Sequence, residues 1–543
     1  MHKTWKGFLT GAAAAIAMTG AASTAHALCG DLDNNGSVAI NDVVLHLNAV
    51  NGSSATICGG PGANYAACAN LDGKGPIPTD TNDTVLELNK ASGIVNCKPD
   101  QCITETVLSC AGPTNIPTVG SGVNLFVPNT CDARLANGLT FVQAGGILNI
   151  QAGTTIKAAT GNPVAALIVK PGARINSTGT AASPIVFTSA GAIPISGDWG
   201  GINLLGKAPV NQPGVTLEGL PPDPSLQYGG TDGNDFSGCV QYTRVNYGGR
   251  ELSPDNELNN VTMAGVGRKT IINHVQAHRG FDDDFEWFGG TVNTSFLVAS
   301  ACGDDCFDTQ LGTVGGVQFG VAMQEAESVE TPGSNGFEND NSEFGFNNTP
   351  INNPKYCNIT ALGAKYSAAN PGTTNQLGIL SRRGNAITIA NSIVKDFRQA
   401  GYQLRDPETA VHACVNPTTL NTTAPVGQII NSLFNNNGTG GTVHANDGAG
   451  CPSGGTCTCS SPEHFALLVA QKNVLPTTDA SIAAIGGGSF PRTNLVPAGG
   501  TLAATHPSAD CTLINSSFVS APYIGAFQPG GTDWTAGWTS YPN

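Results

Sequence analysis

Seven carboxylates lie close together between residues 281 and 308, in a chain of which only 12% of the residues are charged. The stretch FDDDFEWF contains four of them, and the stretch CGDDCFD contains the other three. Carboxylate oxygens are good calcium ligands, and paired carboxylates can act as general acid and base on a glycosidic bond. The cluster therefore predicts a calcium site or a carbohydrate-cleaving site.

The two halves of this cluster share one spacing. Asp283 and Asp305 are 22 residues apart, and so are Glu286 and Asp308. If 22 residues form one coil of a solenoid, these carboxylates stack on neighbouring strands, which lie ~4.8 Å apart. Like charges at that distance raise one another's pKa or require a cation, and calcium is the predicted cofactor. The side chains predicted to bind it here are Asp282, Asp284 and Asp304.

Three interpretations of the cluster remain open from the sequence. The first is a structural calcium site or an acidic, solvated turn. In the second, paired carboxylates hydrolyse a glycosidic bond while an aromatic ring stacks on the sugar. In the third, calcium neutralises a uronate and an arginine removes a proton from the sugar, assisted by His274 or His278. The candidate catalytic residues are Asp283, Asp305, Asp308 and Arg279, and the candidate substrate-binding residues are Trp287, His278 and Arg250.

Short apolar alternations broken by Gly, Asn and Thr fill the chain from about residue 120 and would have to position these side chains. The segments ILNIQAGTTIKAATG and ALIVKPGARINSTG superpose with an offset of 19, which places Leu148 on Leu167 and Gly153 on Gly172. A period near 20 with inward aliphatic residues and a turn glycine is typical of stacked coils, because each coil buries its aliphatic residues against the next.

These repeats, together with the segments 184–211 and 523–539, resemble the secreted bacterial right-handed parallel β-helix proteins. The resemblance covers most of 120–543 and implies a mainly β fold rather than an activity. No catalytic motif of a pectate lyase or polygalacturonase aligns residue by residue. We predict a β-helix over 121–543 with an insertion near 321–375, and we expect Trp534 and Trp538 to cap its last coil.

Two acidic, glycine-containing loops stand apart at the N-terminus, in 31–48 and 70–89. The first has the spacing of a calcium loop, with the predicted ligands Asp31, Asp33, Asn35, Ser37 and Asp42. The pair resembles a dockerin-type repeat, which implies a small α-helical module over 28–100 and a cohesin-like protein partner. Lys74 and Pro76 interrupt the second loop, so calcium is predicted for the first. Residues 101–120 are predicted to form a linker.

A basic start followed by an apolar stretch predicts a cleaved secretory signal over 1–27. Sixteen cysteines then favour disulfides over zinc, because the close pairs Cys302/Cys306 and Cys457/Cys459 lack further ligands at zinc-like spacing. The formal net charge of −15 argues against nucleic acid and anionic membranes as partners, and no later segment is long and apolar enough for membrane insertion.

The combined prediction is a secreted, calcium-binding β-helix protein that binds an extracellular polysaccharide, with cleavage left open. The alternative is a non-catalytic surface or matrix protein whose solenoid is stabilised by calcium. The serine-hydrolase, nucleotide-binding and zinc-protease classes are excluded because GxSxG, GK[ST] after a glycine-rich loop, and HExxH are absent from the sequence.

Overall fold

The chain divides near residue 100 into two compact units, and the computed structural model describes most of the second. The described residues are 105–253, 256–325, 334–364, 376–414, 426–438, 444–446, 461–487 and 490–542. The predicted signal sequence, the dockerin-like module with its calcium loop, and the pair Cys457 and Cys459 lie outside the described residues.

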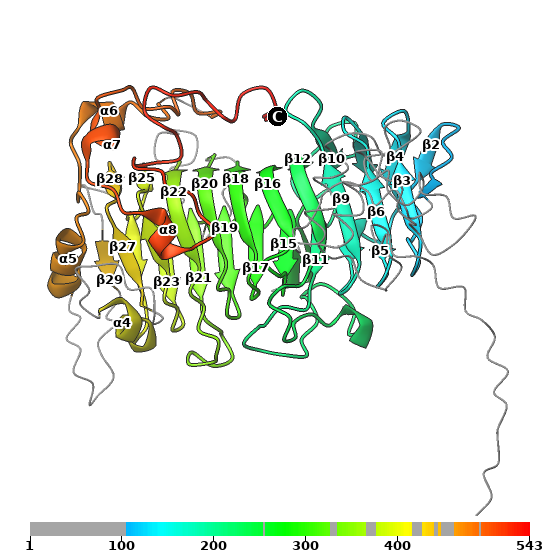
Figure 1. The fold of residues 1–543 in the computed structure, drawn as a ribbon, viewed down its shortest axis with the longest axis horizontal. Coiled ribbons are helices and arrows are strands. Elements are labelled where there is room, and N and C mark those ends of the chain that lie inside the picture. The colour runs from blue at the N-terminus through cyan, green and yellow to red at the C-terminus, as the bar shows by residue number, and fades with distance from the viewer. Residues whose placement is uncertain are drawn as a thin grey trace, which may run out of the picture. The chain divides into compact units, whose positions relative to one another are not determined.

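Two long parallel sheets form the body of this unit, and they run side by side along its length (Figure 1). Sheet A has 17 strands: β1 (Glu105–Val107), β2 (Pro113–Asn115), β3 (Asn124–Val127), β4 (Asp132–Leu135), β6 (Ile147–Ile150), β7 (Thr155–Ala158), β9 (Arg174–Thr178), β10 (Ile185–Ser189), β12 (Gly238–Asn246), β16 (Ile271–His278), β18 (Asn293–Ser300), β20 (Gly316–Met323), β22 (Lys355–Leu362), β24 (Thr388–Ala390), β25 (Ile393–Lys395), β27 (Gln428–Ile430) and β28 (Leu433–Asn435). Sheet B has ten strands: β5 (Leu139–Val142), β8 (Ala166–Val169), β11 (Ile202–Leu205), β15 (Val261–Ala264), β17 (Phe285–Phe288), β19 (Phe307–Gln310), β21 (Phe337–Asp340), β23 (Ile379–Arg382), β26 (Tyr402–Leu404) and β29 (His444–Asn446).

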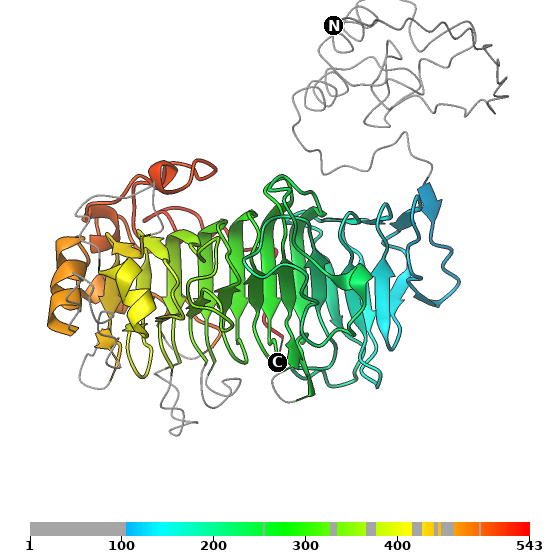
Figure 2. The ribbon, with the colours of Figure 1, turned by 90° about the horizontal axis from the view of Figure 1, so that it is seen from below.

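Each coil contributes strands to both sheets, and where a coil gives sheet A two short strands, as with β3 and β4, one strand of sheet B follows them. After β16 it turns through 279–284 into β17, and then continues into β18, which pairs in parallel with β16. All pairings within the two sheets are parallel between described strands, and Figure 2 shows the strands stacked from coil to coil. A mainly β, parallel β-helix fold is thereby confirmed.

Aliphatic side chains fill the interior of the coils, as the sequence pattern predicts. Leu148 and Leu167 are fully buried, and Gly153 and Gly172 occupy turns with positive φ of 84° and 82°. The offset of 19, however, relates different faces: Leu148 lies in sheet A and pairs with Ile175, whereas Leu167 lies in sheet B. Strands of both sheets alternate inward and outward residues in the same way, so segments from different sheets can resemble each other. The offset of 19 is therefore not the length of one coil.

The predicted domain boundaries need two corrections. β1 and β2 pair with β3 and β4, so the β-helix already includes part of the predicted linker. The predicted insertion near 321–375 is not one excursion, because it contains β21 and β22, which are regular members of the two sheets.

The long strands of sheet A bend at a residue with positive φ, and aromatic rings stack at this bend. The ring centroids of Tyr242 and His274 are 4.3 Å apart, those of His274 and Phe296 4.4 Å, and those of Phe296 and Phe319 4.8 Å. Further along, asparagines take over the same bend, where the left-handed conformation suits them. These asparagines are Asn358, Asn391 and Asn431.

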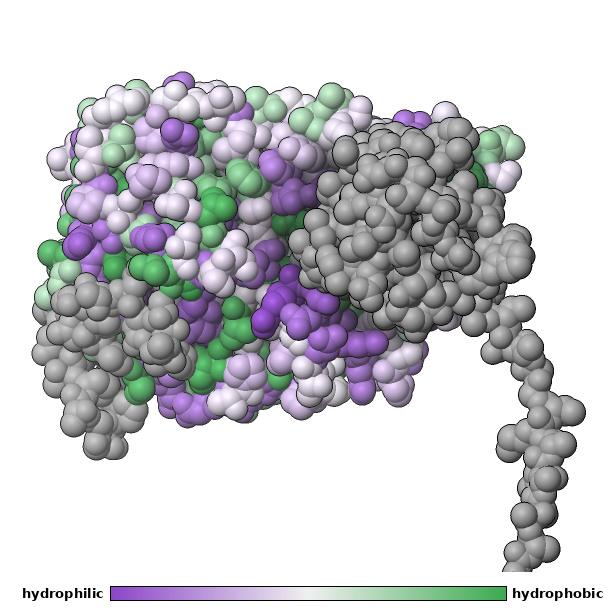
Figure 3. All heavy atoms as spheres, in the orientation of Figure 1, coloured by the Kyte–Doolittle hydropathy of each residue, from purple (hydrophilic) through white to green (hydrophobic). Residues whose placement is uncertain are grey.

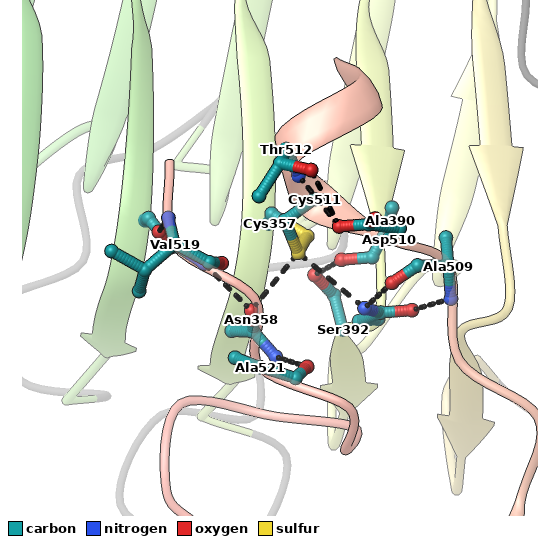
Figure 4. The surroundings of a disulfide bond; sticks show 12 residues. Cys357, Asn358, Ala390, Ser392, Ala509, Asp510, Cys511, Thr512, Val519 and Ala521 are labelled. Carbon is teal, nitrogen blue, oxygen red and sulfur yellow. Dashed lines mark hydrogen bonds between the residues drawn. A yellow bond between two sulfur atoms is a disulfide. The ribbon is translucent and has the colours of Figure 1, made fainter. Parts of the chain in front are cut away.

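The C-terminal segment, residues 490–542, returns along the outside of sheet A from α7 towards β16 (Figure 1). Amide side chains of the coils pair with its backbone in both directions: Gln276 with Ser540, and Gln318 with Val519. The disulfide Cys357–Cys511 joins the segment to β22, and Figure 4 shows it crossing the strands there.

Trp534 and Trp538 belong to this segment, so the prediction that they cap the last coil is wrong. They pack edge-on against His274 midway along sheet A, at centroid distances of 6.4 and 5.7 Å.

Helices occur mainly in the C-terminal part of the described chain. They are η1 (Pro224–Leu226), α4 (Pro407–Ala413), α5 (Ser461–Ala470), α6 (Ala480–Ala483), α7 (Leu502–Thr505) and α8 (Cys511–Ile514). None of the helices among the described residues is long and apolar enough to cross a membrane.

Candidate metal centre

The predicted stacking of carboxylates between neighbouring coils is confirmed. β17 pairs with β19 so that Glu286 lies beside Asp308. In the turns that precede these strands, the backbone N–H of Asp305 donates to Asp283 Oδ1 at 2.9 Å. The two halves of the sequence cluster therefore form one cluster in space.

Asp283 and Asp305 belong to a ladder in which each side chain accepts a hydrogen bond from the backbone of the next coil. Asn259 Oδ1 accepts from Asp283 N at 3.1 Å, and Asp305 Oδ1 accepts from Asn335 N. Asn335 Oδ1 in turn accepts from Leu377 N at 3.2 Å. The ladder needs an oxygen at each step but no charge, since asparagine fills it at both ends.

Asp284 does not fit the predicted role of calcium ligand. It is fully buried, and its oxygens accept hydrogen bonds from Gly280 N at 3.1 Å, Asn260 Nδ2 at 3.0 Å and Ser300 N at 2.7 Å. Burial raises the pKa of Asp284 to about 7 despite these bonds. Its carboxylate closes the turn from the inside, so the prediction is corrected to a structural role.

Glu286 and Asp308 alternate with core residues and therefore point away from the interior of the coil. Glu286 accepts hydrogen bonds from Gln310 Nε2 at 2.8 Å and from Asn259 Nδ2. Asp308 is 8% exposed, and its Oδ1 has no hydrogen-bond partner among the described residues. A buried carboxylate oxygen without a partner is costly unless a cation or water completes it.

Among the described residues, two sets of carboxylates lie close enough to hold a metal ion, and they share Asp283. The outer set is Asp282, Asp283 and Asp304; the inner set is Asp283, Glu286 and Asp308. In each set the ligand atoms lie within 4.8 Å of one another. Asp282 and Asp304 are half-buried, whereas the members of the inner set are at most 8% exposed. The outer set is thus the one open to solvent.

Burial, reinforced by neighbouring carboxylates, raises the pKa of each member of the inner set well above its usual range. Desolvation is the largest cause for each, and repulsion from adjacent acids follows. No Lys or Arg side chain in the described chain forms a salt bridge with Asp283, Glu286 or Asp308. An all-oxygen set with this charge fits a hard divalent cation such as calcium.

The next coil holds carboxylates that the sequence interpretation missed, and arginines neutralise them. Glu338 follows Asp308 in the same row of sheet B and pairs with Arg382. Asp340 pairs with Arg382 at 2.8 Å and with Arg383 at 2.8 Å. The 42-residue separation of Asp340 from Arg382 left no local signal in the sequence.

Glu218 also approaches the cluster from the loop between β11 and β12. Burial, and then Glu257 and Glu343, raise the pKa of Glu218 to about 7. Its charge also raises the pKa of Glu286. Residue 218 lies more than 60 positions before the cluster, so only the tertiary structure brings it there.

Trp287 does not offer a stacking surface for a sugar, which corrects the prediction. Its side chain is 2% exposed and packs in the core, with ring centroids 6.1 Å from Phe285 and 6.2 Å from Phe307. In a strand that alternates inward and outward residues, Trp287 falls on the inward side.

His278 and Arg279 make contacts on the sheet A side of the turn, and these contacts do not fit their predicted roles in substrate binding and catalysis. His278 is fully buried, its Nε2 lies 2.8 Å from Pro542 O, and burial lowers its pKa to about 4. Arg279 forms a salt bridge with Glu325 at 2.7 Å and donates to Pro542 O. The C-terminal segment therefore occupies both side chains.

Arg250 remains beside the acidic turns. It is partly exposed and donates to Gly197 O at 3.0 Å. The preceding residue, Gly249, lies so close to the turn that an added Cβ would be 3.2 Å from Asp282 N.

On the face drawn in Figure 3, hydrophilic and hydrophobic residues are interspersed over short distances.

The comparison with protein-family models agrees with this architecture. The family model described as a pectate-lyase-like beta helix domain matches residues 131–449, more than half of the chain. A solved structure titled as the crystal structure of pectate lyase Pel9A is similar at 11% identity and a TM-score of 0.31, covering 79% of this chain and 97% of that one. No curated protein sequence matches the chain significantly. From the family match, the chain belongs to the pectate-lyase-like beta-helix domain family.

Proposed function

We propose that this protein binds calcium at the carboxylate cluster and, through the outer set, an acidic polysaccharide outside the cell. The observation that carries the proposal is the pair of oxygen sets that share Asp283, together with the lack of any salt bridge from a described Lys or Arg to the inner set. The orphaned Asp308 Oδ1 supports the fit of a cation to the inner set.

The inner and outer carboxylate sets would have different roles. In the inner set, buried Glu286 and Asp308 would hold an ion that offsets their mutual repulsion. In the outer set, Asp282 and Asp304 are half-buried, so this set reaches solvent. Calcium bound there would supply positive charge for the carboxylates of a uronate polymer, because calcium accepts additional oxygen ligands readily.

A polymer fits this surface better than a small metabolite. Parallel coils repeat their side chains at the ~4.8 Å spacing of strands, which gives an extended surface along the solenoid. Arg250, next to the acidic turns, would add a positive charge for a second uronate. The family to which the chain belongs is named for pectate-lyase-like folds, which supports a carbohydrate ligand.

Cleavage is not part of the proposal. Arg279 and His278, two of the predicted proton-transfer groups, are held by Glu325 and by the C-terminal segment. Trp287 is in the core. The catalytic roles predicted for Asp283, Asp305 and Asp308 therefore stay a hypothesis, with Asp283 and Asp305 already engaged in the ladder.

The burial of the inner set favours a second candidate, a non-catalytic surface or matrix protein in which calcium only stabilises the coils. The two candidates differ in whether the outer set meets a ligand. They share the proposed secretion through residues 1–27, and both allow the N-terminal loop of Asp31 to Asp42 to bind calcium and dock a cohesin-like partner.

Binding to polygalacturonate and to a neutral galactan, with calcium or with EDTA, tests the proposal. We expect calcium-dependent binding to polygalacturonate that weakens at least about tenfold in Asp282→Asn/Asp304→Asn. Asp132→Asn, an acid of β4 paired with Arg134, is the matched control and should bind normally. Equal binding in EDTA, or no binding to either glycan, would contradict the polysaccharide role. Absorbance from unsaturated products in the same samples would extend the role to cleavage.

A further inference from the structure

Successive coils close the turn between sheets A and B at the same two positions. Before β15, Gly248 N donates to Asn260 Oδ1 at 3.0 Å. Before β17, Gly280 N donates to Asp284 Oδ1 at 3.1 Å. Both acceptors directly precede paired residues of sheet B, Val261 and Phe285, so they occupy equivalent positions.

The next coil closes this turn with a covalent bond. Cys306 precedes Phe307, which pairs with Phe285, so it stands where Asp284 stands one coil earlier. Cys302 stands where Gly280 stands, because Ser300 pairs with His278. A disulfide joins Cys302 to Cys306. The loop that it encloses is Gly303, Asp304 and Asp305.

We propose that the Cys302–Cys306 disulfide positions Asp304 for cation binding by closing this turn. The inference rests on the proposed calcium site and adds two residues that do not contact the ion. Asp304 is the sole contribution of this turn to the outer set, while Asp282 and Asp283 come from the preceding coil. The backbone on both sides of the enclosed loop is held, since Asp304 N donates to Asp282 O at 3.3 Å and Asp305 N to Asp283 Oδ1.

A disulfide suits this position better than another acidic side chain. A carboxylate equivalent to Asp284 would add a charge to a region that already contains Asp283, Asp305 and Asp308, and like charges repel strongly when buried. The disulfide closes the turn without charge. Both cysteines are fully buried in the core, so the closure is rigid.

Calcium titration calorimetry on the full chain tests this inference. Every protein in the series carries Asp31→Ala and Asp42→Ala, so that the predicted N-terminal loop does not contribute. We expect Cys302→Ser/Cys306→Ser to bind calcium about tenfold more weakly, the size of effect typical of residues that orient metal ligands. Cys302→Gly/Cys306→Asn, which restores the closure of Gly248 and Asn260, should return the affinity to within about threefold of the parent.

Cys110→Ser/Cys131→Ser is the matched control, because it removes a disulfide at the far end of the described chain. It should lower the unfolding temperature without weakening calcium binding. If the serine pair at 302 and 306 does not fold, Cys302→Gly/Cys306→Ala, which lacks only the side-chain acceptor, replaces it in the comparison.

Parent-like affinity without the closure would overturn the inference, as would a Gly/Asn pair that binds no better than the variant without an acceptor. A parent protein that binds no calcium would instead contradict the proposed site itself, and this inference with it. The two failures are therefore distinguishable.

Discussion

Neighbouring coils of sheet B differ in whether arginines pair with their outward-facing carboxylates. On β21, Glu338 and Asp340 pair with Arg382 and Arg383, which follow on the next coil. On β17 and β19, Glu286 and Asp308 occupy the same outward row but have no salt bridge within the described chain. Arginine offsets the charge in one place, whereas in the other the proposed calcium ion would do so. A missing basic partner is therefore the physical signature of a candidate cation site.

Replacing Arg382 by alanine should have the largest effect, because it leaves the buried Asp340 and the half-buried Glu338 with one arginine between them. We expect a loss of about 3–5 kcal/mol in the free energy of unfolding, measured by urea denaturation. Arg134→Ala, which removes a pair whose arginine is 35% exposed, should cost less than about 1 kcal/mol. Similar losses in the two variants would show that arginine does not neutralise this region.

Calcium removal should destabilise the acidic region by a smaller amount. At a calcium concentration about 100 times the dissociation constant, one site adds about 2.7 kcal/mol, which chelation would remove. Thermal unfolding with calcium and with EDTA measures it, in a protein carrying Asp31→Ala and Asp42→Ala. Glu286→Gln/Asp308→Asn should abolish most of the difference; an undiminished calcium effect in that variant would place the ion elsewhere.

The calcium-free protein should become less stable as the pH rises from about 4 to 7. Burial raises the pKa of Asp284 to about 7 from a normal value of 3.8, and the pKa values of the inner set are raised as well. Below pH 4 these groups are protonated in both the folded and the unfolded protein. Above it the unfolded chain ionises first and is favoured, so the free energy of unfolding falls by on the order of a few kcal/mol. Urea denaturation in EDTA across this range checks the sign, and stability that rises with pH would contradict it.

Asparagine substitutions at Asp283 and Asp305 should affect calcium affinity differently, and these are the smallest effects that we predict. Asp305 lies in neither cation set, and Asn335 fills the next step of its ladder. We expect Asp305→Asn to change calcium affinity less than about threefold, and Asp283→Asn to weaken it about tenfold. Calorimetric titration distinguishes them, and equal losses would mean that both aspartates bind the ion.

Local sequence pattern was enough to predict the parallel β-helix and the stacking of Asp283 on Asp305 and of Glu286 on Asp308. A solenoid repeats the same short-range rule in each coil, so a 22-residue spacing translates directly into neighbourhood in space. The preference for disulfides over metal at Cys302 and Cys306 was also local, since these cysteines are only four residues apart.

The functions of single side chains could not be predicted in the same way. Trp287 is aromatic and adjacent to the acids, but the strand turns it into the core. Asp284 is one residue from Asp283, but it closes the turn from inside. Neighbouring residues in a strand point to opposite faces, so a shift of one residue reverses the direction of a side chain. The sequence does not show which residues each turn directs inward.

The sequence by itself determined the coil and the concentration of negative charge, because both depend on contacts between residues about one coil apart. Only the tertiary structure decided which carboxylates lack a basic partner, since Glu218, Arg382 and Pro542 reach this region from distant parts of the chain. Charge compensation acts through space, so a linear spacing can place acids together but does not show what neutralises them.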